Sequence, residues 1–249
     1  MDTKTALIIG ATSAIAFAVA RKLASQNYKL FLVGRNAERL ECIQKDLQAR
    51  SNCTVAIYHL DLNDIDRQKI MLETAQKFLG QIDITLIAQG TLPNQLECQE
   101  DVTKTLYHFN TNATSIIALL TLLSKLIYQP QKLGTIAVIS SVAGDRGRKS
   151  NYIYGAAKAA VTAFTSGLRA RLTSDNVNVL TIKPGFVDTP MTAHIQPKGL
   201  LWASPEKVAD DILRSINKRS AVVYTPYFWR WIMAIIKHIP ENIFKKISL

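Results

Sequence analysis

The stretch TALIIGATSAIAFAVARKL, residues 5–23, contains a short apolar run, a glycine and a second run with helical spacing. Thr5–Ile9 is typical of a buried strand, and residues 15–23 are typical of a helix. Between them, GATS at residues 10–13 predicts a turn that aims backbone N–H groups and a helix start at pyrophosphate. The alternative interpretation is a strand-to-helix connection whose small residues only serve packing.

The same alternation continues along the chain. Strands are predicted at residues 30–33, 55–60, 84–88, 135–139 and 177–182, and helices at 37–49, 65–78, 104–128 and 152–172. This order indicates βαβ units, and right-handed crossovers then give a parallel sheet with helices on both faces. We therefore predict an α/β fold with one doubly wound (Rossmann) sheet in a catalytic domain over residues 1–222. A basic amphipathic helical tail follows over residues 223–249, packed on that domain or extending from it.

Length and composition fit an enzyme of one domain. The 249 residues suffice for a substantial core, and no Gly/Ser-rich or Pro-rich linker divides them. Three cysteines, Cys42, Cys53 and Cys98, lack metal-ligand spacing, so we expect reduced thiols, no metal and a cytoplasmic location. The net charge of +11 predicts an anionic partner: nucleic acid, a phosphate-bearing small molecule or a membrane surface.

Tyr154 and Lys158 stand one helical turn apart in YGAAK, which places both side chains on one helix face. An unperturbed phenol has a pKa near ~10, and a nearby ammonium lowers it. The pair is therefore suited to moving a proton onto or off a carbinol oxygen. The bare spacing is common by chance, so further motifs must support it.

Those motifs are ISSVAG at residues 139–144, TNAT at 111–114 and PGFVDT at 184–189. Together with YGAAK and the first turn, they resemble the short-chain dehydrogenase/reductase family over about residues 4–215. That family's first turn reads T-G-x-x-x-G-x-G, whereas here Gly10 is kept and Ile9, Ala14 and Ala16 replace the other three positions. A second departure is Gln89, which stands where the family has the Asn that steadies its central sheet.

The resemblance implies four catalytic residues. Tyr154 would exchange the proton, Lys158 would bind the nicotinamide ribose and tune Tyr154, and Ser141 would hold the substrate oxygen. Asn112 would kink the central helix and support a proton relay. Ser140 and Asn110 are the neighbouring residues that could be mistaken for Ser141 and Asn112.

The implied cofactor is NADP(H), with NAD(H) as the alternative. Gly34-Arg35 after the second strand offers space and charge for a 2′-phosphate and no carboxylate, although Arg35 could equally be a solvated loop charge. Asp61 would contact adenine or cap the next helix. The full implied set is Gly10, Thr12, Ser13, Ala14, Ile15, Arg35, Asp61, Leu62, Gly90, Tyr154, Lys158, Pro184, Gly185, Val187 and Thr189.

Residues 190–204 match the family's substrate flap, for which Leu200, Leu201 and Trp202 would form an apolar inner surface. His194 is interpreted as a polar flap residue. Ser204-Pro205-Glu206 predicts a helix start, with the helix running through Ile216.

The tail is rich in aromatic, aliphatic and basic residues, with seven Lys or Arg against one Glu in the last 36 residues. Its helical spacing groups Phe228, Trp231, Ile232, Ile235 and Ile239 on one side and Arg230, Lys237 and Glu241 on the other, with Pro240 as a break. This favours peripheral membrane contact through residues 227–249, and the alternative is packing on the domain or a dimer mate. The uncharged run is too short to span a bilayer, and no nucleic-acid motif is present, so no nucleic-acid partner is expected.

The turn, the AQGTLP segment and the tail resemble the bacterial branch of decaprenylphosphoryl-2-keto-pentose reductases. That resemblance implies reduction of a lipid-linked keto sugar at the inner face of the membrane by a homodimer or homotetramer. The alternatives are a soluble 3-oxoacyl or steroid-like carbonyl reductase and a non-enzymatic NAD(P)-binding protein.

Overall fold

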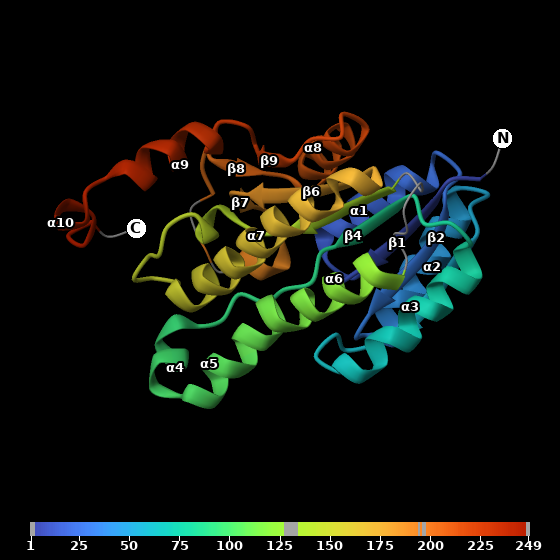
Figure 1. Cartoon of the computed structure of the whole chain (residues 1–249), viewed down its shortest axis with the longest axis horizontal. Helices are drawn as coiled ribbons and strands as arrows, with labels where there is room; N and C mark the ends of the chain where they lie inside the picture. Colours follow the sequence, from blue (N-terminus) through green and yellow to red (C-terminus); the bar gives the residue numbers. More distant parts are fainter. Residues whose placement is uncertain (1–2, 127–133, 194, 196–197, 248–249) are drawn as a thin grey trace.

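The computed structural model describes residues 3–126, 134–193, 195 and 198–247. Within them, seven parallel strands form one sheet in the order β3-β2-β1-β4-β5-β6-β9 (Figure 1). The strands are β1 (Thr5–Ile9), β2 (Lys29–Gly34), β3 (Val55–His59), β4 (Ile84–Ile87), β5 (Gly134–Ile139), β6 (Val177–Pro184) and β9 (Val222–Thr225). The order reverses between β1 and β4, which is the point where such sheets bind ligands beyond their carboxyl ends.

Helices cover both faces of the sheet, as Figure 1 shows. One face packs against α1 (Ala14–Ala24), α2 (Ala37–Arg50) and α8 (Pro205–Asn217), and the other against α3 (Ile65–Leu79), α6 (Ser115–Leu126) and α7 (Tyr152–Leu172). Successive strand residues point to opposite faces. Ala6 and Ile8 therefore enter the first core and Leu7 and Ile9 the second. The predicted doubly wound α/β class is confirmed.

The predicted helix over residues 104–128 is helical throughout its described part, but it is not a uniform α-helix. The structure has α4 (Gln95–Glu100), α5 (Val102–Phe109), a π-helical turn η1 (Asn110–Thr114) and then α6. The side-chain amide of Asn112 donates to the carbonyl of His108 at 2.9 Å, while its Oδ1 accepts from the Thr91 N–H at 2.9 Å. A polar side chain that bonds across the helix in this way accompanies a local widening of the turn. Residues 127 and 128 of the prediction lie outside the described residues.

Short elements follow β5 and β6. They are the 3₁₀ turns η2 (Val142–Gly144), η3 (Thr173–Asp175) and η4 (Pro190–Thr192), and the strand pair β7 (Phe186–Val187) with β8 (Trp202–Ala203). The Trp202 ring stacks on Phe186 with 5.2 Å between centroids. The expected apolar inner surface is wrong for its other two members, because Leu200 is 98% exposed and Leu201 is also exposed. His194 lies outside the described residues.

The C-terminal segment packs on the domain through α9 (Trp229–His238) and α10 (Glu241–Phe244), at the end of the molecule far from the N-terminus (Figure 1). Trp229 and Met233 are buried against Val142. The predicted apolar side is divided, because Phe228 and Ile232 pack against this cluster whereas Trp231 and Ile235 are 64% and 70% exposed.

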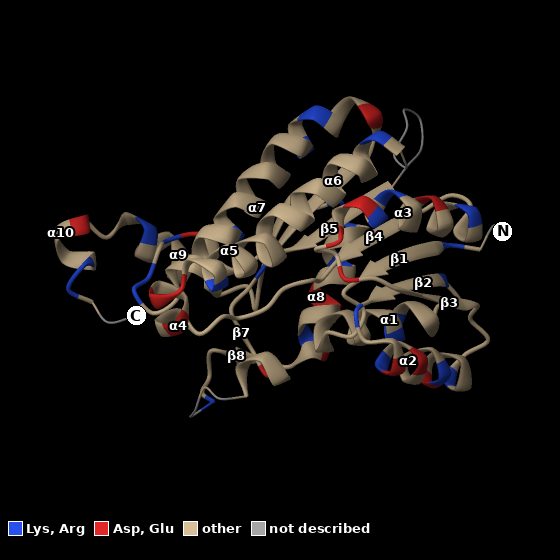
Figure 2. Ribbon diagram, turned by 90° about the horizontal axis from the view of Figure 1, so that it is seen from below, with Lys and Arg blue, Asp and Glu red and all other residues tan. Residues whose placement is uncertain are grey.

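Arg146 fastens this segment. Its guanidinium donates to the carbonyls of Lys237 and Ile239, both at 3.0 Å, and pairs with Glu241 at 2.6 Å. The last carbonyls of a helix lack partners within the helix, so Arg146 satisfies the C-terminus of α9. The predicted break at Pro240 separates α9 from α10, and Figure 2 shows the charged residues that surround this junction.

Candidate active site

The first turn is shaped by Gly10, whose φ of +76° suits glycine. A Cβ at this position would lie 2.8 Å from the Ala88 carbonyl carbon and the Gln89 nitrogen. The Gly10 and Ala11 N–H groups donate to the Val33 carbonyl, and the Ser13 side chain caps α1 through the Ala16 N–H. The N-terminus of α1, which is the positive end of the helix dipole, therefore lies at the carboxyl ends of β1 and β4.

A cavity of about 570 Å³ begins at this turn and runs along the carboxyl ends of the strands. Every residue of the predicted cofactor set lines it, and so does Ser141; the set is Gly10, Thr12, Ser13, Ala14, Ile15, Arg35, Asp61, Leu62, Gly90, Tyr154, Lys158, Pro184, Gly185, Val187 and Thr189. Asn112 is fully buried behind the wall and does not line the cavity. Residues from seven segments of the chain thus meet at one site.

One end of the cavity is basic. Arg35 and Arg39 line it together with Gly34, and the His59 ring donates to the Arg35 carbonyl at 2.9 Å. Asp61 lies beside them and accepts from the Asn63 N–H at 3.0 Å. The interpretation of Asp61 as a helix cap is wrong, because Asp64 occupies the N-cap position of α3.

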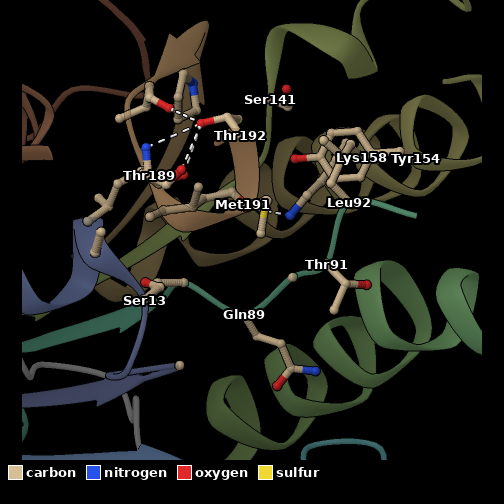
Figure 3. Close-up of a pocket in the computed structure, with 18 of the residues that line it drawn as sticks. Ser13, Gln89, Thr91, Leu92, Ser141, Tyr154, Lys158, Thr189, Met191 and Thr192 are labelled. Carbon is tan, nitrogen blue, oxygen red and sulfur yellow. Dashed lines mark hydrogen bonds between the residues drawn. The ribbon is translucent and has the colours of Figure 1, made fainter. Parts of the chain in front are cut away.

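At the other end, Tyr154 and Lys158 lie side by side on α7, with Ser141 opposite them (Figure 3). The Lys158 ammonium is 5.7 Å from the centroid of the Tyr154 ring and donates to the Ile139 carbonyl at 3.0 Å. Tyr154 is hydrogen-bonded to Ser141, whose Oγ also accepts from the Ala143 N–H at 3.1 Å. Ser140 points away from this group and bonds Thr162 and the Lys158 carbonyl.

Burial governs the protonation of both groups. It raises the pKa of Tyr154 to about 12, against a smaller lowering by the Ser141 hydrogen bond. It lowers the pKa of Lys158 to about 8. We expected Lys158 to lower the pKa of Tyr154, but in the structure this pKa is raised, so Tyr154 is a protonated phenol at neutral pH. A phenol is the protonation state that an acid in ketone reduction needs.

A polar network lies behind this pair. Asn112 Oδ1 and the Lys158 Nζ both flank Gly90, where an added Cβ would lie 2.9 Å and 3.3 Å from them. The Thr91 hydroxyl contacts the amide of Asn112 at 3.3 Å and the ring of His108 at 3.1 Å. The network joins the loop after β4 to α5 and the π-helical turn, and Gly90 lies between it and the Lys158 ammonium.

Gln89 replaces the expected Asn with a different set of bonds. Its side-chain amide donates to the Thr111 carbonyl and to the Ser115 hydroxyl, both at 3.2 Å. Figure 3 shows this side chain directed at the helices. Gln89 thereby ties the end of β4 to the π-helical turn.

The wall opposite α7 is formed by residues 184–192. Gly185 leaves room for the Trp229 indole, because an added Cβ would lie 1.9 Å from its Nε1. Thr189 is held by Thr192, whose hydroxyl accepts from the Thr189 N–H at 3.2 Å and donates to the Val187 carbonyl at 2.5 Å (Figure 3). This pairing occupies the backbone N–H of Thr189, a member of the predicted cofactor set.

The arrangement fits a nicotinamide dinucleotide. The open α1 terminus suits a pyrophosphate, the arginines suit the adenosine end, and the Tyr154–Lys158 pair suits the reacting end. Met191 and Ile195 fall in the predicted flap, but several other lining residues were not predicted from sequence, namely Arg39, Thr91, Leu92, Arg148, Asn151 and Trp229. Of these, only Arg39 had a usable signal, since it is a second Arg four residues after Arg35.

Comparisons with known proteins identify the family of this chain. The sequence profile of the short chain dehydrogenase family matches residues 4–199. An oxidoreductase of Mycobacterium tuberculosis, described as uncharacterized, is 30% identical over 240 residues, covering 96% of this chain and 95% of its own.

Two solved structures share the fold. A short-chain dehydrogenase/reductase from Burkholderia phymatum in complex with NAD has a TM-score of 0.82 at 20% identity, covering 100% of this chain and 97% of its own. An actinorhodin polyketide ketoreductase with NADPH has a TM-score of 0.80 at 20% identity, covering 92% and 97%. Among the described residues, no helix combines the length and apolarity that crossing a membrane requires.

Proposed function

The chain belongs to the short-chain dehydrogenase/reductase family, and we propose that it reduces a ketone to a secondary alcohol with NADPH. Its membership makes it an NAD(P)-dependent oxidoreductase. The direction of reduction is supported by one observation above all: Tyr154 is a half-buried phenol with a raised pKa, hydrogen-bonded to Ser141 in the same cavity as Lys158. A proton donor and a charged neighbour are thus present at one point.

In this proposal, the bound nicotinamide supplies the hydride. Tyr154 donates its phenolic proton to the substrate oxygen, and the Ser141 hydroxyl holds that oxygen in place. The Lys158 ammonium stabilises the phenolate that remains, from 5.7 Å to the ring centroid. Asn112, fixed by Thr91 and His108, positions the buried side of Lys158.

Tyr154→Phe tests the role of the phenol. Loss of the proton donor is expected to lower kcat by about 10²- to 10⁴-fold while the Kd for NADPH stays unchanged. Tyr152→Phe is the matched control, because Tyr152 is exposed and its hydroxyl reaches only Gln99 at 3.5 Å. Near-normal turnover of Tyr154→Phe would refute the assignment.

The preference for NADPH rests on Arg35 and Arg39, which line the cavity beside Gly34 without a carboxylate at the end of β2. Two guanidinium groups can bind a 2′-phosphate, which NADH lacks. The double variant Arg35→Met/Arg39→Met is expected to weaken NADPH binding about 10- to 100-fold and to leave NADH binding nearly unchanged. Arg50→Met, at the far end of α2, is the control, and equal losses for both cofactors would contradict the proposal.

The finer proposal is a lipid-linked keto sugar as substrate at a membrane surface. It is supported by an almost wholly apolar open groove of the tail, whose exposed side chains include Trp231, Ile235 and Ile243. Lys237, Lys245 and Lys246 lie in the same segment and would face anionic headgroups. A truncation before Tyr227 is a poor test, because it would also remove Trp229 from the cavity wall.

Point variants test membrane contact better. Trp231→Ser/Ile235→Ser is expected to abolish co-sedimentation with vesicles that contain phosphatidylglycerol, and Ile70→Ser on α3 is the control at an equally exposed site. A polyprenyl-phosphate keto sugar in the same vesicles is then expected to be reduced. If the wild-type protein does not co-sediment with vesicles, soluble 3-oxoacyl or steroid-like ketones become the candidate substrates.

We also propose a homodimer or homotetramer. The face of α5 beside the start of α7 exposes Val102, Leu106, Tyr107 and Tyr152, and α5 buries no residue of its own. A second copy covering this face would remove these side chains from water. Light scattering on Leu106→Glu checks this, and a monomeric wild type would contradict it.

A further inference from the structure

Arg148 lies in the cavity wall, in the loop between η2 and α7. Among the described residues, its buried Nε has no hydrogen-bond partner, and its Nη2 donates to the thioether sulfur of Met233 at 3.6 Å. A guanidinium carries five N–H donors, whereas a thioether is a weak acceptor. The head of this side chain is therefore short of acceptors.

The carboxylate nearest in sequence, Asp145, acts on Arg148 only through its charge and is bonded to other groups. Asp145 accepts hydrogen bonds from the Lys183 ammonium at Oδ1, at 2.5 Å, and from the Tyr224 hydroxyl at Oδ2, at 2.7 Å. Within the part of the chain that the structure describes, no carboxylate forms an ion pair with Arg148. Arg146, two residues earlier, has such a partner in Glu241.

A cation without a direct ion pair in this position is unfavourable. Burial lowers the pKa of the Arg148 guanidinium from its ordinary value, against a smaller raising by the charge of Asp145. Such a group is stabilised when an anion enters the same low-dielectric space and accepts its hydrogen bonds. The position opens into a cavity that also holds Tyr154, so an arriving ligand can be that anion.

Asn151 is a second unsatisfied group in the same wall. Its Oδ1 is buried without a partner, and it does not cap α7, although Asn151 occupies the N-cap position. The Asn151 N–H donates to the Arg148 carbonyl at 3.1 Å, so the two residues are fixed relative to each other. A donor-rich cation and a free acceptor together suit a ligand with an anionic oxygen group and a nearby hydroxyl.

We propose that the substrate carries an anionic oxygen group, a carboxylate or a phosphate, which binds Arg148 beside the reacting ketone. This inference rests on the proposed ketone reduction and adds its substrate class. Arg148 acts in binding, through charge-assisted hydrogen bonds, and takes no part in the proton transfer. Asn151 accepts a hydrogen bond from a hydroxyl of the same substrate.

Matched ketone pairs test the proposal. Acetoacetate is compared with methyl acetoacetate, and dihydroxyacetone phosphate with dihydroxyacetone, using NADPH and measuring kcat/KM. Wild type is expected to prefer the anionic member of one pair by tenfold or more, and the pair that shows it identifies carboxylate or phosphate. Arg148→Met is expected to bring that ratio near one, whereas Lys149→Met, an exposed neighbour with the same charge, keeps it.

Arg148→Lys guards against a folding effect, since it keeps the charge and is expected to retain part of the preference. A ratio unchanged in Arg148→Met, or no anionic preference in wild type, would overturn the inference. A direct binding arm uses Trp229, which lines the cavity, to follow quenching by acetoacetate or inorganic phosphate. If wild type reduces no ketone at all, the proposed reaction fails, while loss of anion binding in Arg148→Met still decides the role of Arg148.

Discussion

Replacing Lys158 by Met is expected to stabilise the folded protein while removing its activity. Lys158 is 2% exposed, and burial lowers its pKa from 10.5 to about 8. At about 1.4 kcal/mol per pKa unit, holding the ammonium inside the fold costs about 3 kcal/mol at pH 7. Met fills a similar volume without charge, but the Ile139 carbonyl then loses its donor at 3.0 Å, which costs about 1–2 kcal/mol.

The net gain is therefore about 1–2 kcal/mol, or a rise in Tm of about 2–8 °C for a chain of this size. The gain must also depend on pH in a defined direction. Between pH 8 and 10.5, the unfolded chain still binds the Lys158 proton and the folded chain does not, so wild-type stability rises with pH in that window. The advantage of Lys158→Met consequently shrinks as the pH is raised from 7 to 10.

Urea denaturation without cofactor at pH 7 and at about pH 9.5 measures both effects. Lys45→Met is the control, because Lys45 is exposed on α2. The raised pKa of Tyr154 has the opposite effect, a loss of stability above pH 10, but it is present in wild type and variant alike. A variant less stable than wild type at pH 7, or an advantage that does not shrink with pH, would refute the reasoning.

Two further predictions concern the reacting end of the cavity and its wall. The kcat/KM for ketone reduction is expected to fall as the pH rises through about 8, because Lys158 loses its proton there. Tyr154 keeps its proton over this range, since its pKa is about 12. A steady-state profile from pH 6 to 10 that stays flat would contradict this. Gly185→Ala is expected to displace the Trp229 indole and to lower the free energy of unfolding by about 1–3 kcal/mol. Gly147→Ala is the control and lowers it less, because the space around Gly147 is open. Thermal unfolding and indole fluorescence measure both variants, and equal Tm values would contradict the packing of Trp229 on Gly185.

Local sequence signals predicted the elements that hold the site. β1 and α7 lie at the residues expected for them, because an apolar run and a long helical period are both strong patterns. The π-helical turn was not predicted as such, since it depends on hydrogen bonds between Asn112 and Thr111 in the turn and Thr91 and Gln89 after β4. β9 was also missed, although residues 221–224, AVVY, form a short apolar run, because the predicted boundary between domain and tail at residues 222 and 223 divides it.

The basic loop before α7 shows where sequence reasoning ends for the site. Arg146 and Arg148 stand two residues apart with no motif to separate them. The structure turns Arg146 to the tail and leaves Arg148 in the cavity wall. The motif residues could be placed by family resemblance, whereas the residues that would select a substrate come from loops whose direction only tertiary contacts decide.

The tail also shows that sequence periodicity alone does not decide which side chains pack on the domain. Its helix α9 borders both the cavity and the exposed surface proposed for membrane contact. Trp229 with Met233 and Trp231 with Ile235 are both apolar pairs at helical spacing, so periodicity cannot choose which pair faces the core. The space above Gly185 decides it, because only there does an indole fit against the cavity wall. Met233 in turn contacts Arg148, so the buried face of α9 borders the proposed anion site while its other face presents Trp231 and Ile235 to the surroundings. Because one ten-residue helix carries both faces, contact at the surface and recognition in the cavity involve the same rigid element.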